Sequence, residues 1–219
     1  MLKKLGIGFL AIFLTAVATV ALQPSHFSVS RSAVIPSPPG AVFAVLDGFE
    51  HFPDWSPWDE RDPAMRRDLS GPPAGTGASY HWSGNDDVGE GRMTIVETVP
   101  NEKIAVRLEF LRPFPAVNRT EYTLRPEGDG TRLTWTMSGD LGFLGKAFGM
   151  VKSHDQLIGP DFEKGLAKLA PVVEHVAIEA RATTYEALLS PDICQCAQEE
   201  LKCSEPRLLQ GAQESWGRP

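Results

Sequence analysis

Residues 155–178, DQLIGPDFEKGLAKLAPVVEHVAI, constrain the fold more than any other stretch of this sequence. Apolar residues recur there at steps of three or four, the spacing that lines side chains up on one face of an α-helix. Charged residues fall elsewhere around the helical wheel. A stripe of this length needs a large apolar surface to pack against, and the rest of the chain must supply it. The stripe consists of Ile158, Phe162, Leu166, Leu169, Val173 and Val176.

The preceding part of the chain offers such a surface, because its apolar residues alternate with a period of two, as in half-buried strands. A first strand is predicted at 26–35, and alternation is equally clear where Val106 and Leu108 flank Arg107. Turn residues such as Gly128-Asp129-Gly130 separate the segments, which is typical of hairpins. We therefore predict six further strands, at 64–70, 76–84, 89–99, 102–111, 117–126 and 131–139.

Short helices fill the gaps between these strands. Pro38 and Pro39 favour the entry to a helix over 40–49, and a proline-interrupted helical turn is predicted within 51–58. A connecting helix is expected over 141–150. Gly159-Pro160 predicts a kink or a restart in the long helix, and Gly89 and Gly91 predict a bulge or bend in their strand.

The order of these segments predicts an α+β fold. A seven-stranded, curved antiparallel sheet would wrap around the long C-terminal helix, with two short helices after the first strand. A ligand would lie between the sheet and the long helix.

The N-terminal segment, residues 1–24, is predicted to lie outside this fold. Lys3 and Lys4 precede an uncharged apolar run over 5–22, which is just long enough for a transmembrane helix. Small residues near Ala18 and Ala21 also suit a cleaved signal peptide. An uncleaved anchor places the folded domain outside the cytoplasm at the membrane, and cleavage would make the protein secreted.

The C-terminal segment loses the helical pattern, and we expect the folded domain over 25–178 and an extension over 179–219. A short helix is predicted near 181–189, followed by a loose tail. Cys194, Cys196 and Cys203 lie in this tail and suit one disulfide with one free thiol, or ordinary thiols. They lack the fourth Cys or nearby His of a zinc site, so no metal is predicted.

Charge and motifs exclude several classes of function. The net charge of −7 and the isoelectric point near 5.3 argue against a nucleic-acid surface. The sequence has no G-x-S-x-G elbow, no phosphate-binding loop and no H-E-x-x-H motif. Gly75-Thr76-Gly77 lacks a third glycine at the dinucleotide-binding spacing. We therefore expect no cofactor.

Four short segments carry a family resemblance: FPDWSPW at 52–58, GTGASY at 75–80, VGEG at 88–91 and GPDFEKGL at 159–166. With the order of the elements, they make residues 26–176 resemble the SRPBCC superfamily of START-like and birch-pollen-allergen-like proteins. Within it, the chain looks like the bacterial polyketide cyclase/dehydrase-like branch. The resemblance implies the helix-grip fold, in a superfamily that includes lipid transporters, hormone receptors and cyclases.

A helix-grip protein is expected to hold an apolar pocket between its sheet and its long helix. The alternative is that the same aromatic residues simply fill the core, with the tryptophans of the 52–58 turn packed on the sheet. The predicted wall consists of Tyr80, Trp82, Phe110, Tyr122, Trp135 and Met137, the predicted lid of Phe162 and Leu166, and the predicted mouth of Trp55 and Trp58.

Acid–base chemistry in such a pocket requires a titratable side chain inside it. The strand residues of that kind are His81, Arg107, Glu109 and Glu121. Alternation places Arg107 and Glu109 opposite the apolar face of their strand, where they would face solvent. No catalytic residue is therefore predicted from the sequence.

Three functions remain open. The first is binding or carriage of a hydrophobic small molecule, such as a lipid or polyketide-like compound, at the cell envelope, with the membrane as a partner through the N-terminal segment. The second is a cyclase- or dehydratase-like enzyme, as the resemblance suggests. The third is a structural or partner-binding domain with a filled cavity.

Overall fold

The structure of the chain is a computed structural model, and it describes residues 2–188. The C-terminal tail with Cys194, Cys196 and Cys203 lies outside the described residues. The helices are α1 (Leu2–Ala21), α2 (Pro39–Leu46), α3 (Phe52–Trp55), α4 (Phe143–Val151) and α5 (His154–Leu188). The strands are β1 (His26–Ile35), β2 (Arg66–Ser70), β3 (Ser79–Ser83), β4 (Glu90–Val99), β5 (Lys103–Arg112), β6 (Ala116–Glu127) and β7 (Gly130–Asp140).

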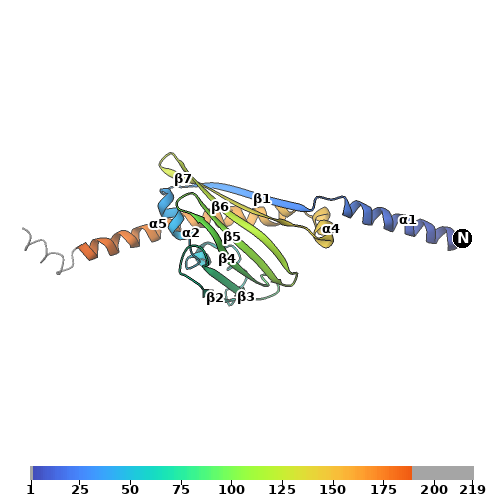
Figure 1. The fold of residues 1–219 in the computed structure, drawn as a ribbon, viewed down its shortest axis with the longest axis horizontal. Coiled ribbons are helices and arrows are strands. Elements are labelled where there is room, and N and C mark those ends of the chain that lie inside the picture. The colour runs from blue at the N-terminus through green and yellow to red at the C-terminus, as the bar shows by residue number, and fades with distance from the viewer. Residues whose placement is uncertain (1, 189–219) are drawn as a thin grey trace, which may run out of the picture. The chain divides into compact units, whose positions relative to one another are not determined.

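All seven strands form one antiparallel sheet in the order β1-β7-β6-β5-β4-β3-β2, and α5 runs along it (Figure 1). The predicted α+β fold is confirmed, including the two short helices that follow β1. From β2 to β7, each strand pairs with the next one along the chain. The first strand, β1, pairs with the last, β7. The chain divides into two compact units, Met1–Val176 and Ala177–Pro219, and the sheet belongs to the first.

Alternation along each strand separates the two faces of the sheet. In β7 the buried residues Leu133, Trp135 and Met137 alternate with partly exposed threonines. Their side chains therefore share one face, which is the face that α5 covers. The middle of the stripe of α5 is buried against it, and this part consists of Phe162, Leu166, Leu169 and Val173.

The predicted irregularity in the strand that contains Gly89 and Gly91 is confirmed. The pairing of β4 with β5 shifts register between Glu90 and Gly91, and Gly89 has a φ of 66°. A Cβ at Gly91 would collide with the indole of Trp82. Glycine at this position therefore lets the indole lie directly over the strand.

The predicted restart at Gly159-Pro160 is wrong, because α5 continues through both residues. A proline removes one backbone hydrogen bond, but the helix on its C-terminal side is fixed to the sheet by its buried stripe. Gly159 has a packing role instead, since a Cβ there would collide with the guanidinium of Arg31. The separate helix predicted near 181–189 is also wrong, because α5 extends to Leu188.

The N-terminal segment forms α1, whose apolar side chains include the highly exposed Phe9, Ile12 and Phe13. Among the helical residues whose side chains are described, no helix is long and apolar enough to cross a membrane. The anchor, the signal peptide and the three-part division of the chain stay predictions.

Candidate ligand-binding cavity

A cavity of about 340 Å³ lies between the concave face of the sheet, the turn after α3 and the first part of α5. Its size falls within the range of small-molecule sites, roughly 300–1,000 Å³. Its wall comes from both ends of the chain: Phe27 on β1, residues of β3 to β7, and His154, Ile158 and Asp161 on α5. Every lining residue belongs to the unit Met1–Val176.

All six residues of the predicted wall line this cavity, and so does Trp58 of the predicted mouth. The predicted residues that line it are Trp58, Tyr80, Trp82, Phe110, Tyr122, Trp135 and Met137. Aromatic rings contact one another around it: Trp82 meets Phe110 edge-on at 6.0 Å between centroids, and Tyr80 stacks on Trp82 at 6.3 Å. The strand alternation thus identified the correct face of the sheet.

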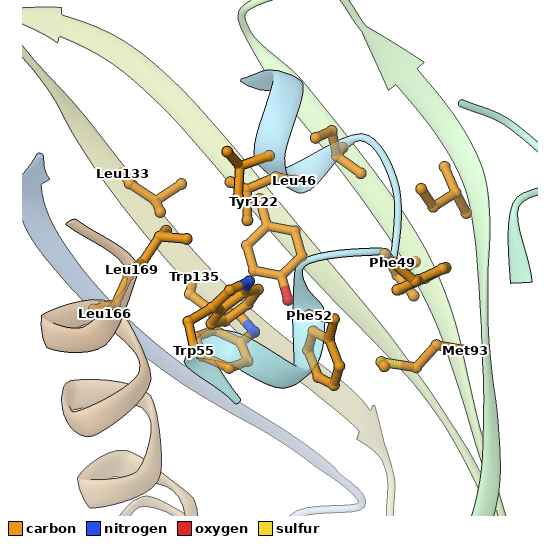
Figure 2. Close-up of a cluster of buried hydrophobic side chains, with 14 of the residues drawn as sticks. Leu46, Phe49, Phe52, Trp55, Met93, Tyr122, Leu133, Trp135, Leu166 and Leu169 are labelled. Atoms are coloured by element: carbon orange, nitrogen blue, oxygen red, sulfur yellow. The ribbon is translucent and has the colours of Figure 1, made fainter. Parts of the chain in front are cut away.

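Three predicted residues, Trp55, Phe162 and Leu166, lie in the packed core instead of lining the cavity. Phe162 stacks flat on Trp135, with centroids 3.9 Å apart and an interplanar angle of 9°. Trp55 meets the same indole edge-on at 5.4 Å. The two indoles lie together in Figure 2, and these contacts fill the space where a ligand would have to lie.

The lid lies further toward the N-terminus of α5 than predicted. His154, Ile158 and Asp161 face the cavity, and His154 stacks on Phe27 with centroids 4.6 Å apart. Arg31 on β1 holds this part of the helix, because its Nη1 donates to Asp155 at 2.7 Å and its Nε donates to Glu163 at 2.6 Å.

The polar part of the wall was not found by sequence reasoning. The sequence did contain a pattern that points to two of these residues. By alternation along β6, Asn118 and Thr120 share the face of Tyr122. Asp59 lies in the turn after α3, where no periodic pattern indicates the direction of its side chain. The polar lining residues are Ser56, Asp59, Asn118, Thr120, Asp140, His154 and Asp161.

Asp59 is the most buried charged group of this wall, with 9% of its surface exposed. Arg67 Nε donates to its Oδ1 at 2.6 Å, which fixes the carboxylate and balances its charge. Nearby, burial raises the pKa of the Tyr80 phenol, and the negative charge of Asp59 raises it further. Burial likewise raises the pKa of Tyr122. Both phenols therefore stay protonated at neutral pH and can donate hydrogen bonds.

The strand residues considered for acid–base chemistry lie elsewhere. Arg107 Nη2 donates to Glu109 at 3.0 Å, and Glu121 pairs with Arg119. His81 lies within 3.4 Å of Glu90. The cavity wall in the described part of the chain includes none of these candidates. Among the side chains that the structure describes, no group of three His, Cys, Asp or Glu residues suits a metal ion.

Comparisons with known proteins agree with this geometry. The sequence profile of a family described as "Polyketide cyclase / dehydrase and lipid transport" matches residues 26–174. The structure of an uncharacterised protein from Rhizobium leguminosarum matches with a TM-score of 0.51 and 17% identity, over 68% of this chain and 95% of that one. The solution structure of the KanY protein matches with a TM-score of 0.50 and 16% identity, over 69% and 99%. At these identities the two structures show the fold alone. The comparison with curated proteins found no match.

Proposed function

Because this chain belongs to the polyketide cyclase/dehydrase and lipid transport family, we propose that it binds or carries a hydrophobic small molecule in its internal cavity. The observation that carries the proposal is the cavity of about 340 Å³, whose surface is largely apolar and rich in aromatic rings. Apolar enclosure supplies affinity in such sites, and a small number of polar groups fixes the orientation of the ligand. This space supports ligand binding over the third function considered, a domain with a filled cavity.

The helix beside the cavity supports exchange of the ligand with a lipid environment. α4 connects Leu141 to His154, both of which line the cavity. Every residue of α4 is at least partly exposed, and its apolar side chains include Phe143, Leu144 and Phe148. An apolar surface of this kind is costly in water and typical of contact with a membrane or another apolar partner.

The location at the cell envelope is part of the same proposal. Lys146 Nζ on α4 donates to the carbonyl of Ala21 at 3.3 Å, so the end of α1 lies against α4. If α1 anchors the chain in a membrane, the folded domain stands outside the cytoplasm with its cavity close to the lipid. Signal cleavage would instead release the domain, and the same cavity would then work in a secreted carrier.

A cyclase- or dehydratase-like enzyme is the second candidate, because titratable groups face the apolar cavity. His154 and Asp161 lie one above the other on α5, and both line the cavity. Such groups are the ones that proton transfer to an enclosed substrate requires. If the variants His154→Gln and Asp161→Asn left turnover of a polyketide-like substrate unchanged, this candidate would fail.

The carrier function is tested on the full-length protein in detergent. Extraction with organic solvent and mass spectrometry should reveal a co-purified apolar compound, and the neutral fluorescent probe N-phenylnaphthylamine should bind saturably. The variant Ala116→Trp places an indole at the cavity wall and should weaken the probe about ten-fold or more. Ala167→Trp, on the exposed side of α5, is the matched control. Absence of both a co-purified compound and saturable probe binding would overturn the proposal.

A further inference from the structure

Four buried polar atoms on the cavity wall have no hydrogen-bond partner within the geometry of the described residues: Oδ2 of Asp59, the hydroxyl of Tyr80, Oγ1 of Thr120 and Nε1 of Trp135. Two of them, Oδ2 of Asp59 and the hydroxyl of Tyr80, belong to residues that both interact with Arg67. The side chain of Tyr80 is almost entirely enclosed, with 2% of its surface exposed. An unpartnered buried polar group costs about 1–3 kcal/mol, so such groups are normally satisfied by protein, water or ligand.

These two groups lie at the same end of the cavity. Arg67 faces Trp82 across the pairing of β2 with β3, two positions along the ladder from the pair of Leu69 and Tyr80, and so on the same face of the sheet. The same Arg67 binds Asp59 through Nε. Asp59 and Tyr80 are therefore both close to one arginine, whose charge acts on the pKa of Tyr80, and both line the cavity.

The hydrogen bonds of Arg67 leave a defined pattern for a ligand. Its Nε is occupied by Oδ1 of Asp59, and its Nη1 donates to the carbonyl of Met65 at 3.1 Å. Oδ2 of Asp59 remains as an acceptor, and the protonated phenol of Tyr80 remains as a donor. A hydroxyl group matches this pair, because it can donate one hydrogen bond and accept another.

We propose that Asp59 and Tyr80 anchor a neutral hydroxyl at one end of an otherwise apolar, ring-containing ligand. The ligand hydroxyl donates to Oδ2 of Asp59 and accepts from the hydroxyl of Tyr80, while the aromatic wall encloses the rest of the molecule. This inference rests on the proposed binding function and names its ligand class: phenols and alcohols with a small fused-ring body. Carboxylic acids are excluded, because a carboxylate has no proton to donate and would bring a second negative charge beside Asp59.

Displacement of N-phenylnaphthylamine from the full-length protein tests this ligand class with three compounds of nearly equal shape. At neutral pH a naphthol should bind about ten-fold or more tightly than naphthalene, because a hydrogen bond to a charged group contributes roughly 1.5–3 kcal/mol. Naphthoate should bind no better than naphthalene. Equal affinity for the naphthol and naphthalene would overturn the anchor but leave the carrier function intact, provided that the probe itself binds saturably. Failure of the probe to bind would overturn both.

Variants assign the selectivity to the two residues. Tyr80→Phe should reduce the preference for the naphthol over naphthalene several-fold and leave the affinity for naphthalene unchanged. Asp59→Asn removes the negative charge and should improve the relative binding of naphthoate. Thr134→Val removes a hydroxyl from the other face of β7, at a residue that does not line the cavity. This control should keep the preference of the wild-type protein, and loss of the preference in it would contradict the assignment. If Tyr80→Phe does not fold, the comparison of the naphthol, naphthalene and naphthoate on the wild-type protein still tests the proposed hydroxyl anchor.

Discussion

The two ends of the apolar stripe on α5 face the same sheet, yet one end is solid core and the other borders a cavity. Toward the C-terminal end, Phe162, Leu169 and Val173 have no exposed surface. Toward the N-terminal end, Ile158 is only partly buried and lines the cavity with His154. The residue types are similar, so composition does not explain the difference.

The side chains that join the helix to the sheet differ between the two parts. In the packed part, Gly165 lies against the ring of Trp135, so the helix approaches closely and the stacked pair of Phe162 and Trp135 fills the space. In the cavity part, ion pairs from Arg31 to Asp155 and Glu163 hold the helix to β1. Ion pairs at the rim fix a helix without filling the space beneath it. A ligand site therefore requires ion pairs at the rim, which hold the helix in place, and no packed side chains in the space beneath the helix.

The largest expected effect comes from truncating the same stripe at its two ends. Leu169→Ala should lower the free energy of unfolding by about 2–5 kcal/mol, because it leaves a void in a closely packed core. Ile158→Ala should cost only about 1 kcal/mol, because its side chain already borders empty space. Urea unfolding measures both, and probe binding should change only in Ile158→Ala. Equal losses of stability would contradict the division of the helix into two parts.

The close approach at Gly165 can be tested by adding a single methyl group. A Cβ there would lie 2.9 Å from the ring of Trp135 and 3.4 Å from Pro57. Overpacking lowers the free energy of unfolding by about 1–3 kcal/mol. The higher helix propensity of alanine offsets about 1 kcal/mol of this loss. Gly165→Ala should therefore lower stability by about 1 kcal/mol. Gly8→Ala is the control, because that helical glycine has open space around it, and it should be neutral or slightly stabilising.

The rim contact should show a dependence on pH with a defined sign. Hydrogen bonds from Arg31 lower the pKa of Asp155 below its ordinary value. A lowered folded-state pKa contributes stability above the unfolded value of about 3.9, and this contribution is lost as the pH falls through the folded-state pKa. Arg31→Met should therefore melt at a lower temperature than the wild-type protein at neutral pH. Thermal melts should show this small difference shrinking below about pH 4; a difference independent of pH would point to lost packing alone.

The smallest effect is expected from an unpartnered hydroxyl in the cavity wall. Thr120 is 3% exposed, and its Oγ1 finds no acceptor or donor within the described structure. Thr120→Val keeps the shape of the side chain and removes the polar atom, so stability should stay the same or rise by up to about 1 kcal/mol. Chemical denaturation of both proteins measures this change. A clear loss of stability would mean that the hydroxyl has a partner, such as bound water.

Sequence patterns predicted the sheet better than they predicted the site. The alternation that places Tyr122 and Trp135 on one face depends only on the pleat of each strand, so it was readable directly. The same alternation contained Asn118 and Thr120 but did not reveal whether they would meet solvent, core or ligand. Asp59 was missed altogether, because it lies in a turn where no periodic pattern gives the direction of its side chain.

The sequence by itself determined the seven strands, their pairing partners along the chain and the buried stripe of the long helix, because hydrophobic periodicity and turn residues act over short distances. Only the tertiary structure decided where that stripe stops being core. That boundary depends on contacts between residues far apart in the chain, such as Gly165 against Trp135. For the same reason, only the fold brings Asp59 near Tyr80 and leaves Oδ2 of Asp59 and the hydroxyl of Tyr80 without a hydrogen-bond partner among the described residues of the cavity.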